Sequence, residues 1–171
     1  LDYRREGTPA LLPMVLTRGH LPEAQRAAVA REMLRLRTFM ACEAVRLAAK
    51  YATDIGVARE HLERAPSLDA DPSAHALNEL DLYRELTIAS GISPAVWMVN
   101  AFWAPLREVN ALLAPMMGQV DPEFQATMNE LLRRVEQHDE EGAMTLVESW
   151  FERVDARLLE VIEGVWPGGA S

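Results

Sequence analysis

The sequence has little of what catalytic and metal sites are usually built from: it contains one cysteine, four histidines and no glycine-rich loop. The single cysteine, Cys42, lies in an apolar helical run, which excludes an internal disulfide and indicates a reducing compartment. The four histidines are scattered, and there is no CxxC pair, no HExxH motif and no glycine-rich phosphate loop. No arrangement of serine and histidine supports a nucleophilic site. These absences leave an enzymatic function without support, and we expect that the protein is not an enzyme.

Long apolar runs are also missing, apart from residues 86–106, which carry no charge. Gly91, Pro94 and Pro105 interrupt this stretch, so a buried loop and a core helix explain it better than a membrane span. The chain opens with charged residues and shows no signal-peptide pattern. Its net charge of −9 repels phosphate groups. We therefore expect a cytoplasmic protein whose 171 residues bind neither nucleic acid nor a membrane.

Alanine, leucine, glutamate, arginine and methionine dominate, whereas β-branched residues are few, and this balance favours helices. Ser73 is the expected N-cap of one helix, and Asp121-Pro122 is the expected start of another. Apolar residues spaced by about 3.6 positions predict helices over residues 8–16, 21–53, 55–65, 73–90, 94–114, 122–138 and 139–165. The predicted fold is all-α, an antiparallel bundle of six or seven helices.

The chain has the length of one domain. We expect a linker arm and a short helix in residues 1–20, the helical bundle in residues 21–166, and a frayed tail in residues 167–171.

Two arginines lean toward the interior of the predicted bundle. Arg37 falls about 60° from the centre of its helix's apolar stripe, and Arg84 about 50° from the centre of its own. One interpretation is a forked site for a carboxylate or phosphate ligand. The other is that each arginine pairs with an internal acid, such as Asp81 or Glu152, or extends to solvent. Helical spacing leaves both open.

Other candidate side chains have simpler interpretations. His75 and Glu79 have a spacing compatible with a metal, but both point away from the apolar face of their helix and are expected on the surface. Met128 and Trp150 lie in the middle of apolar stripes and are expected in the core.

Three segments resemble, in order and spacing, the FCD domain, the effector-binding half of FadR-type GntR transcriptional regulators. They are Leu36-Arg37-Thr38-Phe39-Met40 continued to Ala49, residues 79–91, and Asp139 onward to Trp150. The opening residues 1–7 resemble the linker that follows the winged helix-turn-helix of such regulators. The resemblance implies a helical bundle around an effector pocket, a homodimer, and operator DNA bound only by a winged helix-turn-helix that is absent from this chain.

Most FCD domains hold a metal with one aspartate and three histidines. The matching positions here are Leu80, Arg84, Met128 and Trp150, which cannot coordinate a divalent cation. The resemblance therefore implies a pocket without a metal and without another cofactor.

The fatty-acid-responsive members of the family lack the same metal set. Their pocket arginine matches Arg37, the next residue matches Thr38, and a glutamate of their acyl site matches Glu152, whereas a glycine and a tryptophan of that site correspond to Trp150 and Arg157. This implies a small carboxylate or acyl-type effector in an apolar cavity. The candidate ligand-binding residues are Arg37, Tyr83, Arg84, Asn100, Met128, Trp150 and Glu152.

The leading functional hypothesis is thus the ligand-sensing domain of a GntR-type regulator. The alternatives are an all-helical enzyme that acts on a small carboxylate and a dimerisation or adaptor module with a packed interior. A cavity of roughly 300 Å³ or more would favour the sensor over the packed module.

Overall fold

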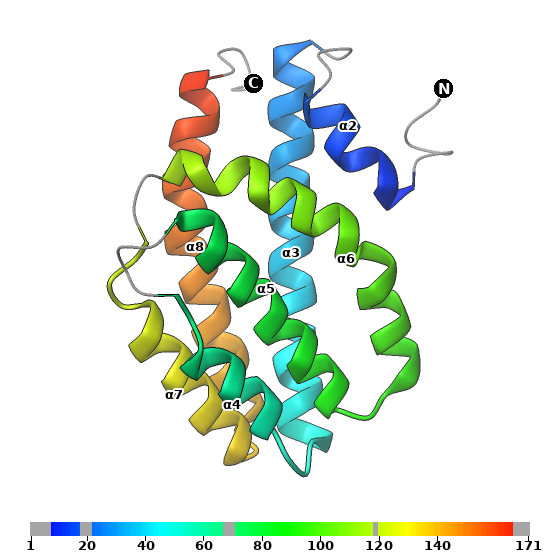
Figure 1. Ribbon diagram of the computed structural model, residues 1–171, viewed down its shortest axis with the longest axis vertical. Coiled ribbons are helices and arrows are strands. Elements are labelled where there is room, and N and C mark those ends of the chain that lie inside the picture. The colour runs from blue at the N-terminus through cyan, green and yellow to red at the C-terminus, as the bar shows by residue number, and fades with distance from the viewer. Residues whose placement is uncertain (1–7, 18–21, 67–70, 118–119, 166–171) are drawn as a thin grey trace.

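The computed structural model describes residues 8–17, 22–66, 71–117 and 120–165 (Figure 1). Within these ranges the chain forms helices and turns and no strand, so the predicted all-α class is confirmed. The predicted arm before residue 8 and the predicted tail at residues 167–171 lie outside the described residues.

Each predicted helix is present, with ends that differ from expectation by a few residues. The elements are η1 (Pro9–Leu11), α2 (Leu12–Thr17), α3 (Glu23–Tyr51), α4 (Gly56–Glu63), α5 (Pro72–Ala89), α6 (Ser93–Leu113), η2 (Ala114–Met117), α7 (Phe124–Glu136) and α8 (Glu140–Val165).

Two predicted helix starts were wrong because an aspartate forms a turn just before the helix. The N-cap of α5 is Asp71 rather than Ser73: the Asp71 side chain accepts a hydrogen bond from the Ser73 backbone N–H. Before α7, Asp121 Oδ1 accepts from the Glu123 backbone N–H at 2.9 Å, and the helix begins only at Phe124. At α5 the aspartate caps the helix earlier than expected, whereas before α7 an Asx-type turn takes the place of the first predicted helical residues.

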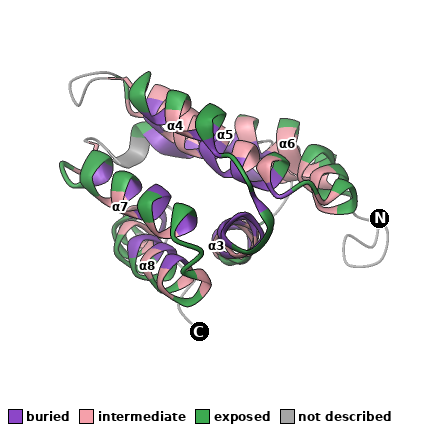
Figure 2. Cartoon of the chain, turned by 90° about the horizontal axis from the view of Figure 1, so that it is seen from below, coloured by how far each residue is buried: buried purple, intermediate pink, exposed green. Residues whose placement is uncertain are grey.

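The long helix α3 lies between two groups of helices (Figure 2). One group is the row of α4, α5 and α6, and the other is the pair of α7 and α8. Helices α3 and α8 run antiparallel along much of their length, as Figure 1 shows, and they share the most extensive packing of the bundle. Because α3 faces both groups, inward side chains of α3, α5 and α8 meet in the interior.

Small residues on α3 allow this close packing. Ala41, Ala44, Ala48 and Ala49 are buried, and large side chains from α5, α7 and α8 fill the space beside them. Tyr51, the last residue of α3, is 50% exposed. The end of α3 packs against α7, so the alanines form the buried face there.

The prediction of a core helix in residues 94–114 is only half correct. Leu106, Val109 and Leu113 are buried in the second half of α6, but Trp97 is 69% exposed and Met98 is 61% exposed in the first half. Among the described residues, no helix has the length and apolarity needed to cross a membrane.

Candidate functional site

A cavity of about 90 Å³, partly open to solvent, lies where α3, α5, α6 and α8 meet the segment that precedes α7. It is lined by Arg37, Pro72, His75, Ala76, Glu79, Asn110, Leu113, Ala114, Val120, Asp121, Phe124, Trp150, Val154, Arg157 and Leu158. Apolar side chains make up most of this wall, and a few charged groups interrupt it. Such a mixture is typical of ligand pockets, although drug-sized ligands occupy pockets of about 300 Å³ or more.

Arg37 points inward from α3, as its spacing predicted, and its side chain is only 14% exposed. Its guanidinium forms an ion pair with the Asp155 carboxylate of α8 through Nη2 and lies 4.4 Å from the centre of the Phe151 ring. The Arg37 Nε atom is buried and has no hydrogen-bond partner. Arg37 therefore has an internal acid, Asp155 rather than Asp81 or Glu152, and still offers one buried N–H group.

Glu79 extends from α5 into the same cavity. Its Oε1 accepts a hydrogen bond of 2.7 Å from the indole Nε1 of Trp150. Burial raises the pKa of the Glu79 carboxyl, and the nearby positive charge of Arg37 acts in the opposite direction. Burial likewise raises the pKa of Asp155 against the effect of Arg37. Two carboxylates thus compete for one interior arginine.

The prediction that His75 and Glu79 lie on the surface was wrong. His75 is 5% exposed, and its ring contacts the Phe124 ring edge-on with centroids 5.6 Å apart. A surface position for both residues requires that α5 buries only its main apolar face. In the structure α5 packs against α3, α4, α6 and η2. A helix that is covered on several sides buries residues well outside its main apolar stripe.

A second, smaller cavity of about 30 Å³ also borders Arg37. Arg37, Tyr83 and Arg84 all line it, so three of the predicted site residues come together there. Trp150 lines only the larger cavity, which Arg37 also borders.

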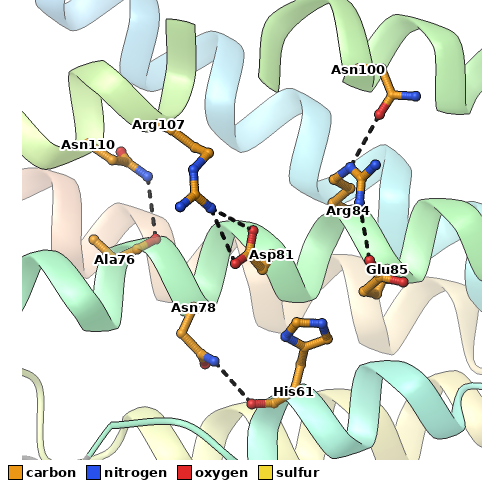
Figure 3. A network of polar contacts seen from close by, with 9 residues as sticks. All are labelled: His61, Ala76, Asn78, Asp81, Arg84, Glu85, Asn100, Arg107 and Asn110. Carbon is orange, nitrogen blue, oxygen red and sulfur yellow. Dashed lines mark hydrogen bonds and ion pairs between the residues drawn. The ribbon is translucent and has the colours of Figure 1, made fainter. Parts of the chain in front are cut away.

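Arg84 is held at the edge of the bundle rather than deep inside it. Its side chain is 31% exposed, its Nε donates to Asn100 Oδ1 at 3.2 Å, and its Nη1 pairs with Glu85 at 3.3 Å. Figure 3 shows these contacts beside an ion pair between Asp81 of α5 and Arg107 of α6. Asn100 therefore positions Arg84 and does not line either cavity.

The two remaining predicted residues lie apart from both cavities. Met128 is fully buried, and the Tyr83 hydroxyl donates a hydrogen bond of 3.8 Å to its sulfur. Glu152 is exposed on α8. The cavity instead presents charged residues that were not expected there: Glu79, Asp121 and Arg157, with Asp155 beside Arg37.

The positions that match the family's metal ligands do not fit a metal. Trp150 is bonded to Glu79, Arg84 to Asn100, and Leu80 and Met128 are buried apolar side chains. Within the part of the chain that the structure describes, no three histidine, cysteine, aspartate or glutamate residues are grouped so as to hold a metal ion. The absence of a metal remains a prediction.

In helical bundles, ligand sites are built from side chains on facing helices, as in the cavity described here. The family model of the FCD domain matches residues 32–153, the larger part of the chain. The chain belongs to the FCD domain family, the effector-binding domains of GntR-superfamily transcriptional regulators. No curated protein and no solved structure matches it.

We expect Glu79→Gln to remove the free-energy cost of burying an ionised carboxylate at neutral pH, and so to raise the stability of the folded protein there relative to acidic pH. A folded-state pKa above the ordinary value of 4.5 means that the folded protein binds more protons than the unfolded chain, so stability falls as the pH rises above 4.5. Glutamine cannot ionise and still accepts from Trp150. The free energy of unfolding of the variant, minus that of the parent, should therefore increase between pH 4 and pH 8 in urea titrations.

The matched control is Glu152→Gln, because Glu152 is an exposed carboxylate on α8. Its difference from the parent should stay nearly constant over the same pH range. Equal pH profiles for the two variants would show that Glu79 is not desolvated.

Proposed function

We propose that this domain senses a small carboxylate effector, which binds in the 90 Å³ cavity with its carboxylate against Arg37. The observation that carries the proposal is Arg37, which lines the cavity and whose buried Nε–H has no hydrogen-bond partner. A buried donor without a partner is costly, and an anionic acceptor in the cavity would satisfy it.

The size of the cavity supports a small carboxylate rather than an acyl thioester. A cavity of 150 Å³ in another protein accommodates benzene, and the cavity here measures about 90 Å³. It is also smaller than the roughly 300 Å³ that would by itself favour a sensor over a packed module. The proposal consequently rests on the chemistry of Arg37 and not on volume.

The ion pair of Arg37 with Asp155 suggests how binding would reach the rest of the bundle. Arg37 belongs to α3 and Asp155 to α8, the two helices with the most extensive mutual packing. A carboxylate that attracts Arg37 weakens its hold on Asp155. The effector would then favour a different arrangement of α3 against α8, in proportion to its differential affinity for the two arrangements.

FCD domains belong to regulatory proteins. We further propose that this chain is not an enzyme, functions in the cytoplasm as a homodimer, and does not itself contact operator DNA, which a winged helix-turn-helix would bind. The exposed Trp97 and Met98 on α6 are apolar side chains that a second copy would cover. The net charge of −9 supports the absence of direct DNA contact.

Thermal unfolding with a panel of small acids tests the proposal. Acetate, propionate, lactate and alanine should be compared with the corresponding primary amides. A ligand at a hundredfold excess over its Kd stabilises the folded state by about 2.7 kcal/mol, which for a chain of this length raises Tm by about 5–10 °C. The amides should give far less, because they leave the guanidinium without an anion. A panel without any response, or equal responses to acids and amides, would contradict the proposal.

A further inference from the structure

We propose that the effector is a small zwitterion, an amino acid whose carboxylate binds Arg37 and whose ammonium group binds Glu79. This inference rests on the proposed function and names the chemical class of its ligand. It is carried by the arrangement of charges around the cavity.

The charged groups of the cavity do not balance. On the solvent side, Asp121 pairs with Arg157 at 3.2 Å and lies 3.6 Å from Arg153, so its charge is compensated. On the inner side, Arg37 pairs with Asp155. Glu79 lines the same space and forms no ion pair within the described part of the chain. One guanidinium therefore faces two carboxylates.

A plain carboxylate would make this imbalance worse. Bound against Arg37, it would place a third negative charge near a single cation, in surroundings that already raise the pKa of Glu79 and Asp155. A zwitterion adds no net charge. Its ammonium group would give Glu79 the cation that it lacks, and its carboxylate would accept from the Nε–H of Arg37.

The donors and acceptors that remain available match such a ligand. The indole of Trp150 donates to Glu79 Oε1, and the Tyr83 hydroxyl also interacts with this carboxyl. A carboxylate has about four lone-pair sites, so Glu79 retains the capacity to accept from an ammonium group as well. Leu113, Phe124, Val154 and Leu158 form an apolar wall that suits a short hydrocarbon side chain. The cavity of about 90 Å³ favours a small amino acid over a larger one.

Isothermal titration calorimetry on the whole chain tests the inference with ligands that differ by one charged group. L-Alanine and β-alanine carry both groups, propionate carries only the carboxylate, and ethylamine carries only the ammonium. One of the two amino acids should bind about tenfold to a hundredfold more tightly than propionate, the range expected for one charged hydrogen bond. Ethylamine should bind more weakly than that amino acid by a similar factor.

Glu79→Gln should remove the preference, because glutamine keeps the contact with Trp150 but carries no charge. Its affinity for the amino acid should fall at least tenfold, and its affinity for propionate should equal or exceed that of the parent. Glu152→Gln, an exposed change on α8, should leave all affinities unchanged.

Each other outcome overturns a stated part of the account. If propionate binds the parent as tightly as both amino acids, the zwitterion inference is wrong and the proposed carboxylate sensor stands. If ethylamine binds as tightly as the amino acids, or if no ligand in the series binds, the proposed function fails together with the inference. The parent protein alone decides these outcomes, whether or not the Glu79 variant folds.

Discussion

Replacing Arg37 by methionine is expected to lower the free energy of unfolding of the ligand-free protein by about 3 kcal/mol, equivalent to a fall in Tm of about 6–12 °C. The substitution leaves the Asp155 carboxylate without its cation on a side chain that is only 16% exposed. It also removes the contact between the guanidinium and the Phe151 ring. Chemical denaturation in urea measures the change.

A double-mutant cycle assigns the loss to the ion pair. Arg37→Met combined with Asp155→Leu should recover most of the stability, because an apolar pair replaces a buried ion pair at little cost. Arg35→Met, on the exposed side of the same helix, is the matched control and should change stability by about 0.5 kcal/mol or less. A single variant at Arg37 as stable as the parent would mean that Asp155 is not the structural partner of Arg37.

Filling the cavity should abolish the response to the effector. Ala76 lines the cavity from α5, and Ala76→Leu introduces an isobutyl group in place of a methyl group. We expect the stability of the ligand-free protein to change by about 1 kcal/mol or less, because the cavity accommodates the added group. The ligand-induced gain of about 2.7 kcal/mol at a hundredfold excess over Kd should be lost entirely. Thermal melts with and without the best ligand give both quantities.

Ala126→Leu provides the matched control, since Ala126 is an exposed alanine on α7. It should retain the full ligand response. A response that persists in the Ala76 variant would place the binding site elsewhere in the molecule.

The fold could be predicted because it depends on local signals. Apolar residues at helical spacing, together with proline and aspartate at the helix starts, defined each helix to within a few residues. The family resemblance rested on segments that the FCD model covers, around Arg37, Arg84 and Trp150. The inward direction of Arg37 follows from the 100° turn per residue, and its side chain is indeed mostly buried.

The details of the site depend on contacts between distant parts of the chain. Asp155 lies 118 residues from Arg37, and helical spacing gives no means of choosing it over the other acids of the sequence. Helical periodicity places Glu79 on the surface only if α5 buries a single face. In the structure its carboxyl accepts a hydrogen bond from Trp150, which is 71 residues away in the sequence. Such pairings are set by how the helices pack, which periodicity alone does not determine.

The most direct test of the sensing account is native mass spectrometry of the intact chain with the amino-acid and carboxylate series. The account predicts one small molecule bound per chain in the parent protein, the same occupancy in Ala126→Leu, and none in Ala76→Leu. A parent protein that stays free of ligand across the whole series, or equal occupancy in the parent and the Ala76 variant, would contradict the claim that this cavity is an effector site.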